Sequence, residues 1–268
     1  PIHFHHIESN GKAIQWKNEG VRFLQKEAGT VKWEAVNTSQ KLRMQVNAAL
    51  EFDGFLAYTV QLVALDDLSF KDIAFHIPVN PAMADYFMGL GKKGGQRPDS
   101  ILWKWDVAHK NQDGGWIGNV SAGLQFSLRD EHYVRPLNTN FYLQKPLLLP
   151  QSWGNGTNGG IDIFRKGSPV LVNAYNGGRS MKAGDTLYYN FNLLITPFHA
   201  INTDFQWKNR FYHKYEDLNS IKSKGASLVN IHHANAINPY INYPFIEWKK
   251  MKAYIDSAHA LGLKVKIY

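Results

Sequence analysis

Short segments with alternating apolar residues fill roughly the first 200 positions, and this pattern constrains the fold more than any other feature. They cover residues 21–24, 55–63, 73–77, 123–128, 170–172 and 186–195. Alternation gives a strand one buried and one wetter face, as in antiparallel sheets. Turn sequences such as Asp53-Gly54 and Asn176-Gly177 separate the segments. The pattern predicts a mainly β fold, a large antiparallel β-sandwich over residues 1–200 with one core and only single turns of helix.

Two segments within this region are long and rich in glycine, at residues 89–99 and 151–160. Loops of that length in a compact domain often carry function. Their length makes both segments candidates for functional loops.

The pattern changes after Thr196-Pro197. Apolar residues at helical spacing predict helices over residues 211–224 and 245–261, and Gly225 and Gly262 follow them as C-caps. Residues 228–232 and 263–268 have strand patterns. The second helix is expected to turn four residues toward the sheet: Trp248, Met251, Ile255 and Ala258.

Strand, helix and strand in this order predict a right-handed βαβ unit with adjacent parallel strands. Two parallel strands alone have open edges and uncovered faces. We therefore interpret residues 201–268 as the beginning of a larger α/β domain, cut at its second strand, with residues 1–200 as a separate sandwich domain. A small α/β lobe resting on the sandwich is the alternative.

Charge and composition exclude several classes of protein. The formal net charge is +8, but the basic residues are scattered, which favours a solvated surface over a nucleic-acid partner. The chain has no cysteine, so disulfides and thiolate zinc sites are excluded. No run approaches the roughly 18 apolar residues that a membrane helix needs, and the first residues do not form a signal peptide.

The loop after residues 228–232 is the best candidate site, because loops at the carboxyl ends of barrel strands form active sites. Imidazole, amide and phenol groups of this loop suit sugar hydroxyls. The preferred substrate-binding residues are His233, Asn235, Asn238 and Tyr243. His232 is less favoured, because neighbours on a strand face opposite ways. The alternative is that the prolines form rigid turns and the histidines cap the strand.

Three other motifs are interpreted as structural. The carboxylates of Asp130-Glu131 would point apart in an extended segment, and pairing with Arg129 and Arg135 is favoured over acid–base catalysis. The histidines near the start of the chain, His3, His5 and His6, have no obvious carboxylate partner, so no metal site is expected. The segment 89–95 lacks the ending and the strand–loop–helix context of a phosphate loop.

Several motifs in order resemble glycoside hydrolase family 123-like proteins over roughly residues 50–268. They are Met88-Gly89-Leu90-Gly91, Gly94-Gly95-Gln96-Arg97-Pro98, Trp103-Lys104-Trp105-Asp106, Asn111-Gln112-Asp113, Arg135-Pro136-Leu137-Asn138-Thr139-Asn140-Phe141-Tyr142, Ser152-Trp153-Gly154-Asn155 and the segment 232–245. The resemblance implies an N-terminal β-sandwich followed by a catalytic (β/α)8 barrel.

The resemblance also implies a bacterial, exo-acting enzyme that removes terminal β-linked N-acetylgalactosamine. In such enzymes the substrate's acetamido group is the nucleophile, an Asp orients it, and an adjacent Glu is the general acid and base. That pair belongs to a later barrel strand, so no catalytic residue is carried over to this chain. The implied partner is a glycan, the implied location is secreted, periplasmic or cell-surface, and no cofactor is implied.

Two other functions stay open at this point. A non-catalytic carbohydrate-binding sandwich would use exposed, coplanar tryptophans, with Trp103, Trp105, Trp116 and Trp153 as candidates. A lyase or an enzyme for sulfated glycans would need Lys92, Lys93 and Arg97 to converge in one cleft with a Tyr or His base.

Overall fold

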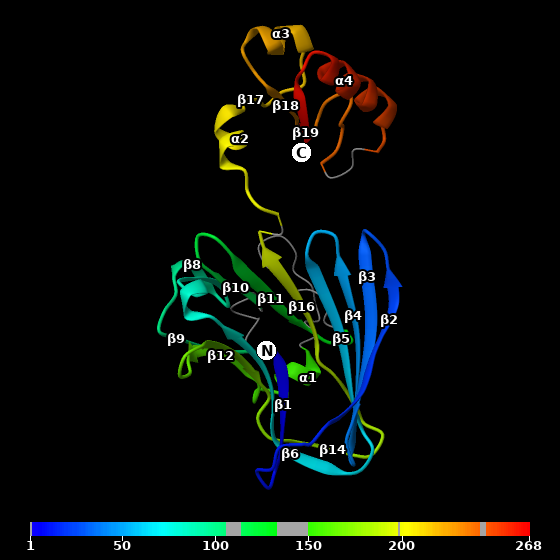
Figure 1. Ribbon diagram of the computed structural model, residues 1–268, viewed down its shortest axis with the longest axis vertical. Helices are drawn as coiled ribbons and strands as arrows, with labels where there is room; N and C mark the ends of the chain where they lie inside the picture. Colours follow the sequence, from blue (N-terminus) through cyan, green and yellow to red (C-terminus); the bar gives the residue numbers. More distant parts are fainter. Residues whose placement is uncertain (1, 106–113, 133–149, 198, 242–244) are drawn as a thin grey trace. The chain divides into compact units, whose positions relative to one another are not determined.

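The computed structural model describes residues 1–268 except 1, 106–113, 133–149, 198 and 242–244. The chain divides into two compact units, Pro1–His199 and Ala200–Tyr268. Figure 1 shows the sheets of the first unit and the smaller α/β arrangement of the second. None of the described helices is long and apolar enough to cross a membrane.

The described part of the first unit contains two antiparallel sheets. One has the order β1-β6-β13-β12-β9, with β14 also paired to β6. Its strands are β1 (His3–Glu8), β6 (Leu68–Val79), β9 (Ser100–Lys104), β12 (Gly160–Arg165), β13 (Val170–Tyr175) and β14 (Arg179–Met181).

The other sheet has the order β2-β3-β4-β5-β16-β11-β10-β7-β8, with β15 also paired to β5. Its strands are β2 (Lys17–Lys26), β3 (Thr30–Thr38), β4 (Leu42–Glu51), β5 (Phe55–Ala64), β7 (Tyr86–Gly89), β8 (Lys92–Gln96), β10 (Gly114–Gly118), β11 (Gly123–Arg129), β15 (Thr186–Tyr188) and β16 (Asn190–Thr196).

One core joins the two sheets. Phe75 of β6 and Phe191 of β16 belong to different sheets, and their ring centroids lie 4.4 Å apart. The ring of Tyr58 of β5 stacks on that of Phe191, with centroids 4.6 Å apart. The described helices here are η1 (Pro81–Met83) and α1 (Gln151–Gly154), each a single turn. The predicted antiparallel sandwich is confirmed.

The pattern at residues 186–195 is not one strand. It divides at Tyr189 into β15 and β16, which both pair with β5. Tyr189 is completely buried, and its hydroxyl donates to Asn176 Oδ1 while Arg179 Nη1 donates to it at 3.4 Å. Burial of this phenol against two polar partners interrupts the alternation.

The glycine-rich segments are more regular than expected. Residues 89–99 include β8, which pairs with β7 in a hairpin. Residues 151–160 begin with α1, whose Trp153 is buried and donates from Nε1 to the carbonyl of Arg129 at 2.7 Å. A Cβ on Gly159 would lie 2.0 Å from the carbonyl oxygen of Trp153, so glycine is required for this close approach.

The second unit is a three-stranded parallel sheet with the order β17-β18-β19 in its described residues. Its elements are α2 (Thr203–Lys208), β17 (Phe211–Tyr212), α3 (Leu218–Ser223), β18 (Leu228–Ile231), α4 (Trp248–Ala260) and β19 (Lys264–Ile267). The predicted parallel pairing of the last two strands, with a crossover helix between them, is confirmed.

Two details of this prediction are wrong. The helix predicted over residues 211–224 is only α3, because Phe211 and Tyr212 form a strand beside β18 and Asp217 caps α3 by accepting from Ser220 N at 2.8 Å. On α4, Met251 and Ala258 are buried and Ile255 packs against them, whereas the Trp248 side chain is exposed. Trp248 is the first residue of α4 and lies beyond the buried stripe.

Candidate functional site

The carboxyl ends of the three parallel strands define the candidate site. Strands of equal direction end at the same edge, and in α/β folds ligands bind outside that edge. The residues that follow the three strands are His213 after β17, His232 after β18 and Tyr268 after β19. Sequence order alone does not bring them together; the strand pairing does.

An amide inside β18 fixes one of these histidines. Asn230 is buried among the apolar residues of its strand, and its Nδ2 donates to His213 Nδ1 at 2.6 Å. A neutral His213 therefore carries its proton on Nε2. Asn230 Oδ1 is buried and has no hydrogen-bond partner within the described part of the chain.

Three rings pack together at the end of β18 and β19. The ring of His232 stacks on that of Tyr268, with centroids 4.5 Å apart and planes inclined by 15°. The ring centroids of His232 and His233 are 4.1 Å apart. The ring of His213 is 5.0 Å from that of His232. Nδ1 of His233 is buried and has no partner among the described residues.

The loop after β18 is held by two asparagines. Asn235 Nδ2 donates to the carbonyl of His232, and its Oδ1 accepts from the backbone N–H groups of Ile237 and Asn238, each at 2.9 Å. Asn238 Nδ2 donates to the carbonyl of Tyr268 at 3.1 Å. Ala234 has a φ of 65°, a conformation that non-glycine residues rarely adopt. The side chain of Asn235 therefore shapes the loop.

Three of the four residues chosen from the sequence come together here: His233, Asn235 and Asn238. Tyr243 lies outside the described residues. Asn238 is buried, and its Oδ1 has no partner in the described ranges. Sequence reasoning missed His213, Asn230 and Tyr268. The available signal was Asn230, a polar residue inside an otherwise apolar strand.

The converging groups can bind hydroxyl groups through amide oxygens and ring nitrogens, and can pack against an apolar sugar face. Within the described part of this unit, no carboxylate is a hydrogen-bond or ring partner of these residues. In the part of the chain that the structure describes, the groups at this edge are imidazoles, amides and a phenol, which suit hydrogen bonding to hydroxyl groups.

The two carboxylates of the acidic dipeptide Asp130-Glu131 have different surroundings in the sandwich. Asp130 is buried just after β11 and accepts from the backbone N–H of His132 at 2.9 Å. Glu131 is exposed and lies 3.7 Å from His132 Nε2. The two carboxylates thus face different environments. Arg135, one of the expected partners, lies outside the described residues.

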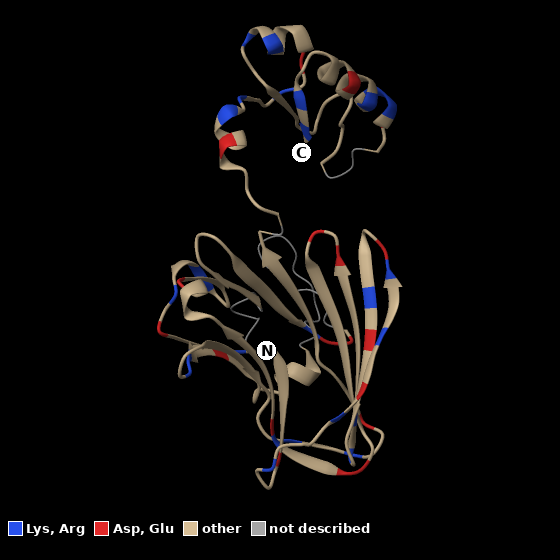
Figure 2. Cartoon of the chain, viewed as in Figure 1, with Lys and Arg blue, Asp and Glu red and all other residues tan. Residues whose placement is uncertain are grey.

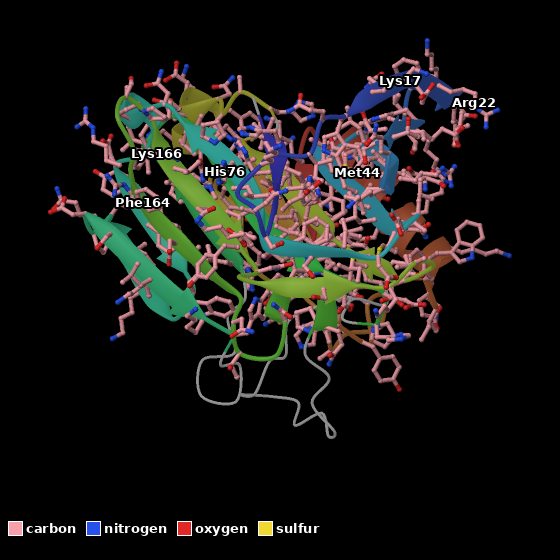
Figure 3. The ribbon with its side chains drawn as sticks, turned by 90° about the horizontal axis from the view of Figure 1, so that it is seen from below. Lys17, Arg22, Met44, His76, Phe164 and Lys166 are labelled. Atoms are coloured by element: carbon pink, nitrogen blue, oxygen red, sulfur yellow. The ribbon has the colours of Figure 1, made fainter. Side chains whose placement is uncertain are left out.

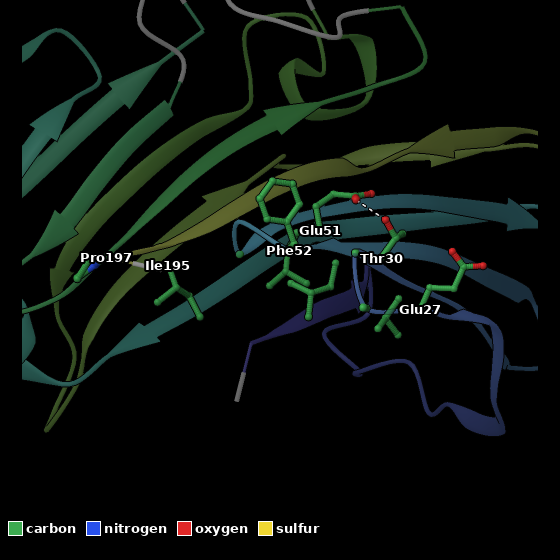
Figure 4. Close-up of a pocket in the computed structure, with 12 residues that line it drawn as sticks. Glu27, Thr30, Glu51, Phe52, Ile195 and Pro197 are labelled. Carbon is green, nitrogen blue, oxygen red and sulfur yellow. Dashed lines mark hydrogen bonds between the residues drawn. The ribbon is translucent and has the colours of Figure 1, made fainter. Parts of the chain in front are cut away.

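A hollow of about 450 Å³ lies on the first unit, at the ends of strands β2 to β5. Figure 4 shows Glu27, Thr30, Glu51 and Phe52 around it, with Ile195 and Pro197 at its other side. Thr30 Oγ1 donates to Glu51 Oε2. This hydrogen bond joins β3 to β4 across the sheet and involves Glu51, one of the two glutamates that line the hollow.

The tryptophans proposed for a carbohydrate-binding sandwich, and the arginine proposed for a lyase-type cleft, make contacts within the sandwich. Trp103, Trp105 and Trp153 are buried in the sandwich core, and Trp116 is half-buried with its Nε1 donating to Thr196 Oγ1 at 2.7 Å. Arg97 donates from Nε to the carbonyl of Ala84 at 2.8 Å. Lys92 and Lys93 are exposed on β8. These tryptophans offer no exposed platform.

Charged residues are interspersed over both units in Figure 2. The expectation that nucleic acid is not a partner stays a prediction.

Comparison with known families is consistent over nearly the whole chain. A family model described as "Glycoside hydrolase 123, third domain" matches residues 1–197, and one described as "Glycoside hydrolase 123, TIM-barrel domain" matches residues 202–268. No curated protein matches the chain.

Among solved structures, the chain is similar to a β-arabinopyranosidase, with 9% identity, a TM-score of 0.40 and coverage of 99% of this chain and 49% of the other. It is also similar to the α-N-acetylgalactosaminidase NagBb from Bifidobacterium bifidum, with 12% identity, a TM-score of 0.39 and coverage of 97% and 54%. A third similar structure is the protein Slr1438 from Synechocystis sp. PCC 6803, with 7% identity and a TM-score of 0.37. The match covers 71% of this chain and 72% of the other. The chain spans about half the length of the two glycosidases.

Proposed function

Because the chain belongs to glycoside hydrolase family 123, we propose that it forms the sandwich and the first barrel strands of an exo-acting β-N-acetylgalactosaminidase. One observation carries the proposal: the carboxyl ends of three parallel strands bring His213, His232 and Tyr268 to one edge. Glycoside hydrolases with a barrel bind substrate at that edge. We extend the proposal to a secreted, periplasmic or cell-surface location, where glycans are accessible.

The described residues of this edge bind and orient the sugar. Asn230 Oδ1, His233 Nδ1 and Asn238 Oδ1 are buried polar atoms without partners in the described ranges. Such atoms are costly unless a ligand, a water molecule or another part of the protein satisfies them. A sugar hydroxyl supplies both a donor and an acceptor, so its binding satisfies these groups.

The chemistry of bond cleavage requires groups beyond this set. A retaining mechanism in which the substrate's acetamide is the nucleophile needs an Asp that orients it and a Glu that protonates the leaving oxygen. The described edge holds imidazoles, amides and a phenol. We therefore propose that the 268 residues bind N-acetylgalactosamine and do not cleave its glycosides.

The binding part of this proposal is tested by titrating the 268-residue protein with N-acetylgalactosamine and following ligand resonances by NMR. We expect His233→Ala and Asn230→Ala to weaken binding by about tenfold each, since one hydrogen bond contributes about 1 kcal/mol or more. His259→Ala, on the exposed face of α4, is the matched control and should bind like the unmodified chain. Equal affinity in all three variants would place the sugar elsewhere.

The alternative function is a carbohydrate-binding sandwich without catalysis. It lacks the tryptophan platform that motivated it, because Trp103, Trp105 and Trp153 are buried. The same titration distinguishes the two, because a sandwich site would be unaffected by substitutions at the edge of the parallel sheet.

A further inference from the structure

Three histidine side chains meet on the solvent-facing side of the first sandwich sheet. His3 and His5 alternate along β1 with Phe4, which packs against the core, and with His6, which is buried. His76 lies on β6 directly opposite His3 in the antiparallel register. The cluster therefore joins an edge strand to its neighbour. Figure 3 labels His76 on this sheet.

The ring nitrogens are close enough to share one ion. One nitrogen from each of the three rings lies within 4.8 Å of the other two, and His3 Nε2 is 2.8 Å from His5 Nε2. The ring centroids of His5 and His76 are 4.6 Å apart. In a tetrahedral zinc site with zinc–nitrogen distances of about 2.0–2.1 Å, ligand nitrogens are about 3.3 Å apart. The observed nitrogen–nitrogen distances, from 2.8 Å up to 4.8 Å, lie on both sides of that value. Small rotations of the rings would therefore bring the three nitrogens to the spacing of a zinc site.

We propose that His3, His5 and His76 bind one divalent transition-metal ion of the zinc class. The ligand set found among the described residues is three imidazoles, which suit zinc, nickel or copper better than magnesium and calcium, since these two require oxygen ligands. Three protein ligands leave a fourth position for water. Because the ligands come from two strands that are distant in sequence, the ion links β1 to β6 and stabilises the folded sandwich.

The protonation state of the cluster agrees with this assignment. The contact between His3 and His5 requires one ring nitrogen to donate and the other to accept, so at least one of the two is neutral. Neutral imidazole is the form that binds a metal.

Two further residues next to the cluster influence the ion in opposite directions. Asn173 of β13 is the register partner of His76, and its buried side-chain oxygen lies beside the His76 ring. This oxygen can accept the second ring N–H of His76, as outer ligands commonly do in metal sites. Lys166, which follows β12, acts on both His5 and His76 through its positive charge, and so opposes a cation.

The test is isothermal titration of the 268-residue protein with zinc chloride after removal of metal by a chelator. We expect one ion per chain and a higher melting temperature with zinc. His76→Gln should weaken binding by more than about 100-fold, because even outer-shell changes cost 10- to 100-fold. His5→Gln should do the same, and its exposed position keeps the fold intact. His259→Gln is the matched control and should bind zinc like the unmodified chain.

Lys166→Gln gives a result of opposite sign, because removal of the nearby positive charge should tighten zinc binding. The proposal is overturned if His76→Gln and His5→Gln bind zinc as tightly as the unmodified chain. It is also overturned if binding is lost on changing His232, since the ion would then belong to the parallel sheet.

Discussion

The ring of His232 stacks on the ring of Tyr268, with centroids 4.5 Å apart and planes inclined by 15°. The two residues directly follow neighbouring parallel strands, and the backbone N–H of Tyr268 donates to the carbonyl of Ile231 at 3.0 Å. Strand pairing therefore sets the position of both rings. The loop after β18 therefore begins beside the end of β19, where the two rings are in contact.

The buried face of α4 gives a first prediction, on the stability of the second unit. Met251→Asp should lower the free energy of unfolding by about 3 kcal/mol or more, because it places an unpaired carboxylate in the core. Trp248→Asp is the control: its side chain is 54% exposed, and the change should stay within about 0.5 kcal/mol. Urea unfolding followed by circular dichroism measures both. Equal losses would mean that Trp248 belongs to the buried stripe.

The hydroxyl of Tyr189 gives a second prediction. It donates to Asn176 and accepts from Arg179, and burial raises the pKa of this phenol. Tyr189→Phe should cost about 1–3 kcal/mol, because Asn176 Oδ1 stays buried without its donor. Tyr188→Phe, at the half-buried neighbour, should have little effect. Denaturant unfolding of the sandwich compares the two variants, and a neutral Tyr189→Phe would show that the hydroxyl contributes nothing.

The glycine-rich segments give a third prediction. Gly159→Ala should destabilise the sandwich by about 3 kcal/mol or more, because the new Cβ would lie 2.0 Å from a backbone oxygen that cannot move freely. Gly95→Ala is the control from the other segment, where a Cβ would meet nothing within 4 Å. It should be neutral or slightly stabilising. Thermal unfolding distinguishes these outcomes, and similar melting temperatures would contradict the packing at Gly159.

Glu216 gives a prediction about acid pH. Its carboxylate accepts from Lys224 Nζ at 2.9 Å, from the Tyr212 hydroxyl and from Ser220 Oγ, and these contacts lower its pKa from 4.5 to about 2. A lowered pKa in the folded state means that the stabilisation is present above pH 4.5 and is lost as the pH falls from 4.5 toward 2.

Glu216→Gln should therefore lower the melting temperature at pH 7, with a much smaller difference at pH 2.5. Asp256→Asn on α4, whose carboxylate pairs with Lys252 on the exposed helix face, is the comparison and should change the melting temperature little at either pH. A difference for Glu216→Gln that is equal at both pH values would show that its ionisation does not stabilise the fold.

The sequence predicted the sandwich and the βαβ order because both depend on local patterns: alternation, turn glycines and helical spacing. It failed where distant contacts override the pattern. Phe211 has a helical phase with Tyr215, yet pairing with Leu228 makes it a strand. Tyr189 lies within an alternating run, yet its buried hydroxyl divides that run.

The candidate site was half predictable for a similar reason. His233, Asn235 and Asn238 lie in one loop after an obvious strand, so position indicated them. His213 and Tyr268 join that loop only through the pairing of three parallel strands. The strand β17 has two residues, which is too short to show any periodicity. His76 likewise meets His3 only through the pairing of β1 with β6.

The last prediction concerns turnover. Glycosidic cleavage needs a proton donor for the leaving oxygen and a second group that holds or attacks the sugar, both in one pocket. The edge formed by His213, His232 and Tyr268 has no carboxylate partner in the described ranges, and Asp130 and Glu131 lie in different environments of the sandwich. The 268-residue protein should therefore release no aryl group from an aryl β-N-acetylgalactosaminide.

A chromogenic assay at neutral and mildly acidic pH measures this directly, with Glu131→Gln as the paired variant. Glu131 is exposed, and among the described residues its carboxylate lies 3.7 Å from His132 Nε2, so its replacement should leave the fold intact and any background rate unchanged. Hydrolysis by the unmodified chain that is abolished by Glu131→Gln would assign catalysis to the sandwich. Hydrolysis that persists in Glu131→Gln and disappears on changing His232 would place an acid at the sheet edge, and the binding-only role would then be wrong.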